Sequence, residues 1–461
     1  MDVVPAPMAH RSFYMSRLLP FCLAVLVAAC AAPPLAREAT PAPVTAAASP
    51  SPTVSAAHSG FVPSVGASGA SPVTLATPTP RPEARVGAAV DLHRFPVGIA
   101  MGAAPQGAAP GGARGFTILA PANSGVWTSE WREPGFTFMR LVPSWDADTP
   151  EGTWVTVEAQ ARRATGGETA WYSFGTWAIG DATLKRASTD GQRDADAHVE
   201  TDTLLASVPL SAYRVRVTVA RSEGVSRPPL LRSVAAVASD DAAVRSAPRS
   251  AHSGIAKDLP VPQYSQEIHA GEYPEYDGGG EAWCSPTSTT MVLGRWGAGP
   301  TPADVWWVDR GYRDPGVDHA ARYTYDATYR GTGNWSFNAA YAAQYGLRAF
   351  VTQLRSLAEA ERFIAAGIPL VASIDVRPGG LPGFLYAQGT DGHLLVIRGF
   401  TAGGDVIVND PAALSNAEVR RVYPRAAFEL AWVGGSGGIV YVIHPPTAPL
   451  PVNVPGATPN W

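Results

Sequence analysis

A single cysteine in the second half of the chain carries the strongest chemical signal in the sequence. Cys284 lies in the stretch GEAWCSPTSTTM, where small residues begin a helical pattern and Pro286 suits a first helical turn. A cysteine there could be a buried thiol, half of a disulfide, a metal ligand or a nucleophile. Nucleophilic attack needs the thiolate, and a helix N-terminus or a neighbouring histidine favours it by lowering the thiol pKa from about 8.5.

A nucleophilic cysteine also needs a base, and one of the nine histidines stands in a suitable place. His393 opens the apolar run HLLVIRGF, and the short TAGG loop then turns the chain back into DVIVND. If the two runs pair as a hairpin, Asn409 and Asp410 come to the end at which His393 begins its strand. Either side chain could hold the imidazole in one tautomer.

The stretches VPQYSQ, WCSPTSTTMVL, GHLLVIRGF and VIVNDPA, in this order, resemble the C39-like cysteine peptidases of the papain-like superfamily. The resemblance implies Cys284 as nucleophile, His393 as base, Asp410 as the residue that orients the base, and Gln266 as an oxyanion-hole donor. Asn409 remains a rival of Asp410, and Gln263 a rival of Gln266. Cys284 is followed by Ser285 where many relatives carry glycine, and we expect this serine to affect the approach of substrate.

The reaction implied by the resemblance is attack on a peptide or related amide bond, with a thioester intermediate that water hydrolyses. An amine acceptor in place of water would make the protein a transpeptidase, and the sequence does not distinguish the two. The substrate would be a peptide or protein, and the chemistry calls for neither a metal nor an organic cofactor. The rival hypothesis is a catalytically idle module that binds a glycan or peptide polymer of the cell envelope.

The first residues predict export. Arg11 and Arg17 precede the apolar run LLPFCLAVLVAAC, which has the length of a signal peptide and is too short for a permanent membrane span. Its end resembles a bacterial lipoprotein box, which implies a signal peptide over 1–29 and a lipid on Cys30. The protein would then be anchored by that lipid alone, facing the periplasm or the extracellular space; the alternative is a soluble secreted protein.

Export makes the cysteine count informative. Cys22 lies within the predicted signal and Cys30 carries the lipid, so Cys284 stands alone in the folded part of the chain. A lone exported thiol cannot form an internal disulfide, and it lacks companions for a cysteine-rich zinc site. The small net charge of −4, with no cluster of Lys and Arg, argues against a nucleic-acid partner.

Composition divides the rest of the chain. Residues 30–85 are rich in Ala, Pro, Ser and Thr and predict a disordered tether. Short alternating runs over 86–246 predict an all-β sandwich, followed by a linker at 247–258. Residues 259–446 would form the peptidase domain, and 447–461 a C-terminal tail.

Alternation is clearest in YRVRVTVA, where Tyr213, Val215 and Val217 fall on one face of a strand and Arg214 and Arg216 on the other. The aromatic residues of this region suit either core packing, which we favour, or a glycan-binding surface. They are Trp127, Trp131, Trp145, Trp154, Trp171, Tyr172 and Trp177.

The peptidase region mixes helical and strand patterns. Helices are predicted after Cys284, in NWSFNAAYAAQYG and in SLAEAERFIAAG, where Ser356 and Glu359 match a capping box. Strands are predicted in IPLVASIDV, HLLVIRGF, DVIVND and GIVYVIH. Helices gathered first and an antiparallel sheet later indicate an α+β domain.

Overall fold

The computed structural model describes residues 90–97, 108–110 and 115–461. The predicted signal peptide, the lipid site at Cys30 and the predicted tether over 30–85 lie outside these ranges. Within the described ranges, none of the helices has both the length and the apolar character needed to cross a bilayer.

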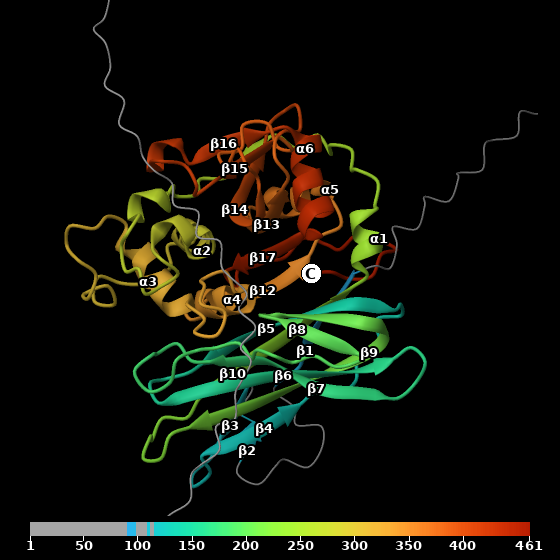
Figure 1. The fold of residues 1–461 in the computed structure, drawn as a ribbon, viewed down its shortest axis with the longest axis vertical. Helices are drawn as coiled ribbons and strands as arrows, with labels where there is room; N and C mark the ends of the chain where they lie inside the picture. Colours follow the sequence, from blue (N-terminus) through green and yellow to red (C-terminus); the bar gives the residue numbers. More distant parts are fainter. Residues whose placement is uncertain (1–89, 98–107, 111–114) are drawn as a thin grey trace, which may run out of the picture. The chain divides into compact units, whose positions relative to one another are not determined.

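The first described region is built of strands that belong to one antiparallel sheet (Figure 1). Its hydrogen-bonded order is β2-β3-β10-β5-β9-β6-β7, with β1 on β10 and with β4 and β8 on β9. The strands are β1 (Val90–Phe95), β2 (Ala108–Pro110), β3 (Phe116–Ile118), β4 (Ser124–Thr128), β5 (Phe138–Asp148), β6 (Thr153–Arg163), β7 (Glu168–Trp177), β8 (Ala197–Glu200), β9 (Thr203–Arg221) and β10 (Leu230–Ser239). Of the predicted all-β sandwich, the β-rich character is confirmed, and the long strand β9 pairs with β4, β5, β6 and β8.

Side-chain burial in this sheet follows the alternation of the sequence. Tyr213, Val215 and Val217 are fully buried on one face of β9, while Arg214 and Arg216 are only partly buried on the other. Trp131 and Trp171 lie on that second face and stack against these arginines, with guanidinium-to-ring distances from 4.2 to 5.2 Å. The aromatic set therefore divides between core and surface: Trp127, Trp145, Tyr172 and Trp177 are buried, whereas Trp131, Trp154 and Trp171 are partly exposed.

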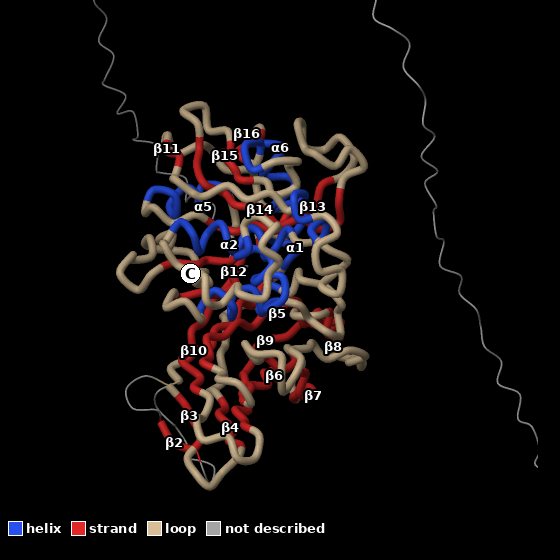
Figure 2. The backbone as a smooth tube through the Cα atoms, turned by 90° about the vertical axis from the view of Figure 1, so that its left-hand side faces the viewer, coloured by secondary structure: helices blue, strands red, loops and turns tan. Residues whose placement is uncertain are grey.

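The second region holds a seven-stranded antiparallel sheet in the order β12-β17-β13-β14-β15-β16, with β11 on β14. Its strands are β11 (Lys257–Asp258), β12 (Arg348–Gln353), β13 (Leu370–Val376), β14 (Thr390–Phe400), β15 (Val406–Asn409), β16 (Arg420–Tyr423) and β17 (Ile439–His444). The helices are α1 (Asp241–Arg245), α2 (Cys284–Arg295), α3 (Pro315–Thr324), α4 (Trp335–Ala343), α5 (Leu357–Ala365) and α6 (Arg425–Glu429), which continues into the π-helical turn η5 (Leu430–Gly435). Figure 2 shows that the helices gather around this second sheet, while the other end of the molecule consists of strands.

Strands β13 and β14 are central to the second sheet and are buried on both faces over most of their length. Their near-continuous apolar sequence is explained by this cover, since a strand with one wet face would alternate. Helix α2 packs against both strands and α5 contacts β14. The two helices lie on opposite sides of this sheet in Figure 1.

Most predicted elements of this region are present, with one local difference. The hairpin of HLLVIRGF and DVIVND forms as β14 and β15, with Val396 opposite Asn409. The predicted capping box does not form, because the Ser356 side chain makes no capping hydrogen bond. Glu359 instead accepts from the backbone N–H and the guanidinium of Arg355, each at 2.8 Å, so the ion pair outcompetes the cap.

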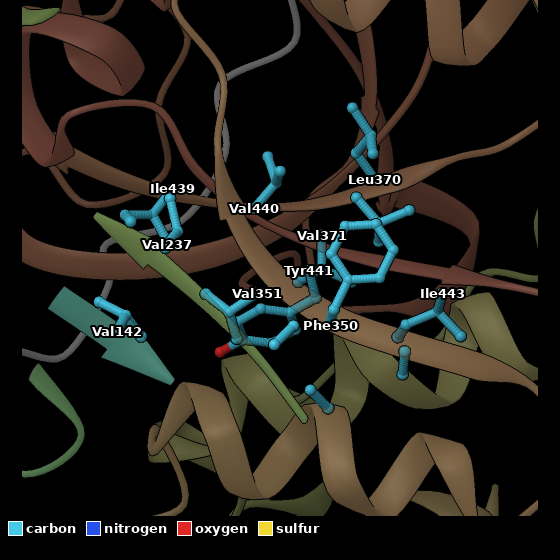
Figure 3. Close-up of a cluster of buried hydrophobic side chains, with 14 of the residues drawn as sticks. Val142, Val237, Phe350, Val351, Leu370, Val371, Ile439, Val440, Tyr441 and Ile443 are labelled. Carbon is cyan, nitrogen blue, oxygen red and sulfur yellow. The ribbon is translucent and has the colours of Figure 1, made fainter. Parts of the chain in front are cut away.

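The two regions share one hydrophobic core. Figure 3 draws Val142 and Val237, from β5 and β10, in the same buried cluster as Phe350 and Val351 from β12. Helix α4 adds Phe337, whose ring centroid lies 6.1 Å from that of Trp145 and 5.3 Å from that of Trp177.

Polar contacts cross the same boundary: the Val351 N–H donates to Ser144 Oγ at 3.2 Å, and the Ser336 hydroxyl donates to the Pro143 carbonyl at 2.6 Å. The segments on either side of the second region also pack onto it. Ser250 Oγ donates to Glu429 at 2.7 Å, and near the C-terminus Asn460 is fully buried.

Replacing Phe337 with alanine is expected to destabilise both regions together. Removing a buried phenylalanine ring costs about 3 to 5 kcal/mol through lost burial and the cavity left behind. Calorimetry should show a single unfolding transition at lower temperature. The control is Leu119→Ala at a half-exposed position, expected within about 0.5 kcal/mol of the wild type. Two separate transitions in the Phe337 variant would contradict a shared core.

Candidate active site

A cavity of about 800 Å³ lies where the two regions meet. Gln266, Cys284 and His393 line it from the second region. The turn between β8 and β9, with Glu200 and Asp202, lines it from the first. The cavity therefore needs both regions for its walls.

A buried histidine and carboxylate face each other beside this cavity. His393 Nε2 lies 2.8 Å from Asp410 Oδ1, and both residues are almost completely buried. The second carboxylate oxygen of Asp410 accepts the Tyr423 hydroxyl at 2.7 Å, and Oδ1 also accepts the Ala412 N–H at 3.1 Å. These contacts leave the carboxylate fully engaged, so it is held in one orientation against the imidazole.

The charges of this pair stabilise each other. Burial by itself would lower the pKa of His393, but the charge and hydrogen bond of Asp410, and then those of Cys284, outweigh burial and raise the pKa to about 10. Burial would raise the pKa of Asp410, but His393 and the hydroxyl of Tyr423 lower it. Because the pKa of His393 lies above its ordinary 6.5, this pairing contributes stability that is complete below about pH 6.5 and is lost as pH rises toward 10.

Cys284 is the first residue of α2, where the helix dipole is positive and the first N–H groups have no partner inside the helix. It is a free thiol, half-buried at the cavity, and its hydrogen bond is one of the causes of the raised pKa of His393. Since Nε2 of the imidazole is taken by Asp410, Nδ1 is the ring atom available to the sulfur. The structure therefore brings Cys284, His393 and Asp410 together from the start of a helix, a strand and the end of the next strand.

Gln266 also lines the cavity, one residue before the short helix η2 (Glu267–His269). Its Nε2 donates to the Glu281 carbonyl at 2.6 Å and lies 3.4 Å from the Tyr386 hydroxyl. An amide nitrogen carries two protons, so the first contact anchors the side chain while the second proton goes to the Tyr386 hydroxyl, which also lines the cavity. Gln263 is not among the residues that line this cavity.

The structure separates Asn409 from the histidine. Asn409 is buried, donates to the Pro262 carbonyl at 2.8 Å and accepts from Arg398 at 2.9 Å. It thus ties β15 to the segment that leads to Gln266. Of the two rival residues, Asp410 is the one that contacts His393.

Three residues near the site were not predicted from the sequence: Tyr386, Glu267 and Tyr423. Tyr386 places its ring edge-to-face with His393 at 5.6 Å, and its hydroxyl donates to Glu267 at 3.2 Å. Tyr423 holds Asp410 from strand β16. The aromatic residues in the loop before His393 were a signal for the first of these, but nothing local pointed to the other two.

Ser285 lies away from the cavity. It is fully buried, it is not among the residues lining the cavity, and its hydroxyl lies 2.9 Å from that of Tyr441. Ser285 is the second residue of α2, and its side chain points toward Tyr441 on strand β17 rather than toward the cavity. The structure therefore gives no support to an effect of this serine on substrate approach.

Two parts of the chain match models of known families. Residues 119–239 match the model of the Peptidase C39 N-terminal domain, and residues 258–438 match that of the Peptidase_C39 like family. The two matches support a C39-like peptidase family, and the second suggests that the protein is a peptidase.

No curated protein matches the chain. A solved structure described as that of the infectious bursal disease virus Gt strain overlaps 33% of this chain and 33% of its own, at 10% identity and a TM-score of 0.17. This chain thus spans about a third of that one, and the overlap is too small to bear on the fold.

Replacing Asp410 with asparagine should lower the pKa of His393, because burial then acts without the opposing carboxylate charge. Histidine-labelled NMR titration would measure the shift. Asn409→Ala is the matched control, since this neighbour does not touch the ring and the titration should stay at its wild-type position. An unchanged pKa in the Asp410 variant, with the fold intact by circular dichroism, would contradict the charge pairing.

Proposed function

We propose that the protein is a cysteine peptidase of papain-like α+β fold that hydrolyses peptide or related amide bonds. Cys284 is its nucleophile, His393 its acid and base, Asp410 the orienting residue and Gln266 an oxyanion donor. The observation that carries the proposal is the buried His393, held by Asp410 at 2.8 Å and coupled to the half-buried thiol of Cys284 at the cavity.

The first step is attack by the Cys284 thiolate on the carbonyl carbon of the scissile bond. An imidazolium beside the sulfur and the positive end of α2 both favour the thiolate over the thiol. The raised pKa of His393 supports an imidazolium near neutral pH. Sulfur and carbon form a bond, the carbonyl π electrons move to oxygen, and an oxyanion results.

The oxyanion requires donors that are already in place. The Cys284 backbone N–H lies at the start of α2, and we propose that the Gln266 proton now directed at the Tyr386 hydroxyl at 3.4 Å turns to the oxyanion. Loss of one such donor typically slows catalysis about 100-fold or more. Because the Glu281 carbonyl already anchors the Gln266 amide, little reorganisation is needed in the transition state.

The imidazolium then gives its proton to the leaving amine as the carbon–nitrogen bond breaks, and a thioester remains. The sulfur of a thioester is neutral, so its contribution to the raised pKa of His393 disappears. The imidazole can now accept a proton from water, which attacks the thioester and regenerates the thiolate. Asp410 keeps the ring in one orientation through both halves of the reaction.

The sequence also supports a cellular setting for this activity. We propose that the protein is exported by its first residues and anchored through a lipid on Cys30, facing the periplasm or the extracellular space. A soluble secreted protein is the alternative. We also propose that the partly exposed tryptophans of the first region bind a cell-wall polymer or another glycan.

The thiol of Cys284 should be unusually reactive. An ordinary thiol is only about 3% thiolate at pH 7, so alkylation by iodoacetamide should run roughly tenfold faster at Cys284 and keep its rate at lower pH. His393→Ala should remove this advantage. Mass spectrometry assigns the label to Cys284 rather than to Cys22 or Cys30, and Cys284→Ser should lower peptide hydrolysis by about 1,000-fold or more.

The same experiment separates the peptidase from an idle binding module. An idle module predicts alkylation of Cys284 at the rate of a model thiol, with no change in His393→Ala. Alkylation at this ordinary rate, in protein with a native circular dichroism spectrum, would contradict the proposal of a peptidase. Tyr312→Phe, an aromatic position outside the cavity lining, serves as the matched control and should label like the wild type.

The charge of the cavity wall points to a substrate class. Carboxylates outnumber guanidinium groups among the lining residues: Glu200, Asp202, Asp277, Glu281, Asp375 and Asp391 face Arg140 and Arg245. Asp202 is fixed by the backbone N–H of Trp335, and burial raises its pKa to about 6, whereas Glu200 is exposed at the turn. We propose that the cleft prefers peptides with Lys or Arg near the scissile bond.

Replacing Glu200 with glutamine should raise KM for a cationic peptide about two- to fivefold, as the loss of one exposed charge contact would. The effect should shrink at high salt because exposed charges are screened. Glu223→Gln, an exposed carboxylate away from the cavity, is the control. Equal wild-type KM values for matched cationic and acidic peptides would rule out the preference.

A further inference from the structure

Three buried ligand-type side chains converge beneath the segment that links Gln266 to Cys284. They are His269 at the end of η2, Glu272 three residues later, and Asp318 on α3. One ligand atom from each lies within 4.8 Å of the others. The imidazole Nδ1 of His269 is 2.6 Å from Glu272 Oε2 and 3.5 Å from Asp318 Oδ2.

Burial and missing hydrogen bonds make this cluster unlike an ordinary ion pair. His269 and Asp318 are 0% exposed and Glu272 is 8% exposed. Within the described part of the chain, neither carboxylate oxygen of Asp318 has a hydrogen-bond partner. A fully buried carboxylate that has no hydrogen bond and one ion-pair contact at 3.5 Å is costly, so its place in this cluster indicates that a cation belongs there.

The charge of the cluster supports the same conclusion. Two carboxylates and one imidazole lie together here, and the ring centroid of His269 is 5.9 Å from that of the buried Trp283. A divalent cation would neutralise the two carboxylates and leave the imidazole as a neutral ligand.

We propose that His269, Glu272 and Asp318 bind a divalent transition-metal ion, with Zn²⁺ as the best match. One imidazole nitrogen and two carboxylate oxygens form a ligand set that zinc accepts, and water can supply the fourth position. For bonds of 2.0 to 2.1 Å a tetrahedral site has edges of about 3.4 Å. The 3.5 Å separation of His269 from Asp318 fits this edge, and Glu272 would need to move by less than about 1 Å.

The place of the cluster gives the metal a structural role. His269 and Glu272 belong to the segment between Gln266 and Cys284, whereas Asp318 belongs to α3. The backbone packs closely here, since a Cβ on Gly280 would lie 2.4 Å from the carbonyl carbon of His269. A metal bridging the segment to α3 would hold the residues that lead into the start of α2.

The test uses the purified chain, free of any affinity tag, with Cys22, Cys30 and Cys284 replaced by alanine. This background removes every thiolate that could bind metal elsewhere. We expect roughly one Co²⁺ per chain, with visible d–d absorption, and displacement by Zn²⁺. Addition of Zn²⁺ should raise the melting temperature, and a strong chelator should reverse the rise.

Asp318→Asn and Glu272→Gln in the same background should each weaken binding roughly 100-fold or more and abolish the thermal shift. Asp309→Asn, an exposed carboxylate close by, is the matched control and should bind like the parent. Absence of Co²⁺ and Zn²⁺ binding in folded parent protein would overturn the site in favour of protons shared within the cluster. Unchanged binding in folded Asp318→Asn would overturn it as well. Neither outcome depends on peptidase activity.

Discussion

The buried contact between His393 and Asp410 is the interaction on which the candidate site depends. Two opposite charges at 2.8 Å inside a protein stabilise each other only if the remaining lone pairs and protons are also satisfied. Tyr423 and the Ala412 N–H meet this condition for the carboxylate, while Cys284 further favours the charged imidazole. A single buried carboxylate thus determines the orientation and the charge of the group beside the sulfur.

The strand pairing of the second sheet brings His393 and Asp410 together. Strands β13, β14 and β15 pair antiparallel, so that His393 near the start of β14 and Asp410 just after β15 come to the same end of the sheet. Helix α2 packs across β13 and β14 and begins at Cys284, which brings its positive end to that point. The chemistry therefore rests on a covered sheet and one well-placed helix start rather than on a loop.

The first region is part of the same unit and not a detached accessory. Its strands β5 and β10 share a core with β12, and its β8–β9 turn closes one wall of the cavity. The backbone N–H of Trp335, at the start of α4, donates to Asp202 in that turn, so the turn is held by the region that carries the site. Access of a substrate to Cys284 is consequently shaped by residues about eighty positions earlier in the chain.

Many of the strands, the hairpin and the start of α2 could be predicted from the sequence, because each depends on residues that are close together in the chain. Alternation placed Tyr213 and Arg214 on opposite faces of a strand, the TAGG loop predicted the hairpin, and the residues after Cys284 predicted a helix that begins there. The order of the motifs around Gln266, Cys284, His393 and Asp410 indicated the family that the two family models support. Asn409 and Asp410 are neighbours that could both orient the imidazole, so the sequence did not determine which of them contacts His393.

Only the tertiary structure decided matters that depend on distant residues meeting. Tyr423 on Asp410, Ser285 on Tyr441 and the His269, Glu272 and Asp318 cluster are contacts between elements far apart in the chain, and no local pattern encodes such distances. The raised pKa of His393 likewise depends on Asp410 and Cys284, which reach the imidazole from other elements and outweigh the effect of its burial. The sequence by itself determined which groups could do chemistry, whereas packing determined which of them are buried, paired and facing the cavity.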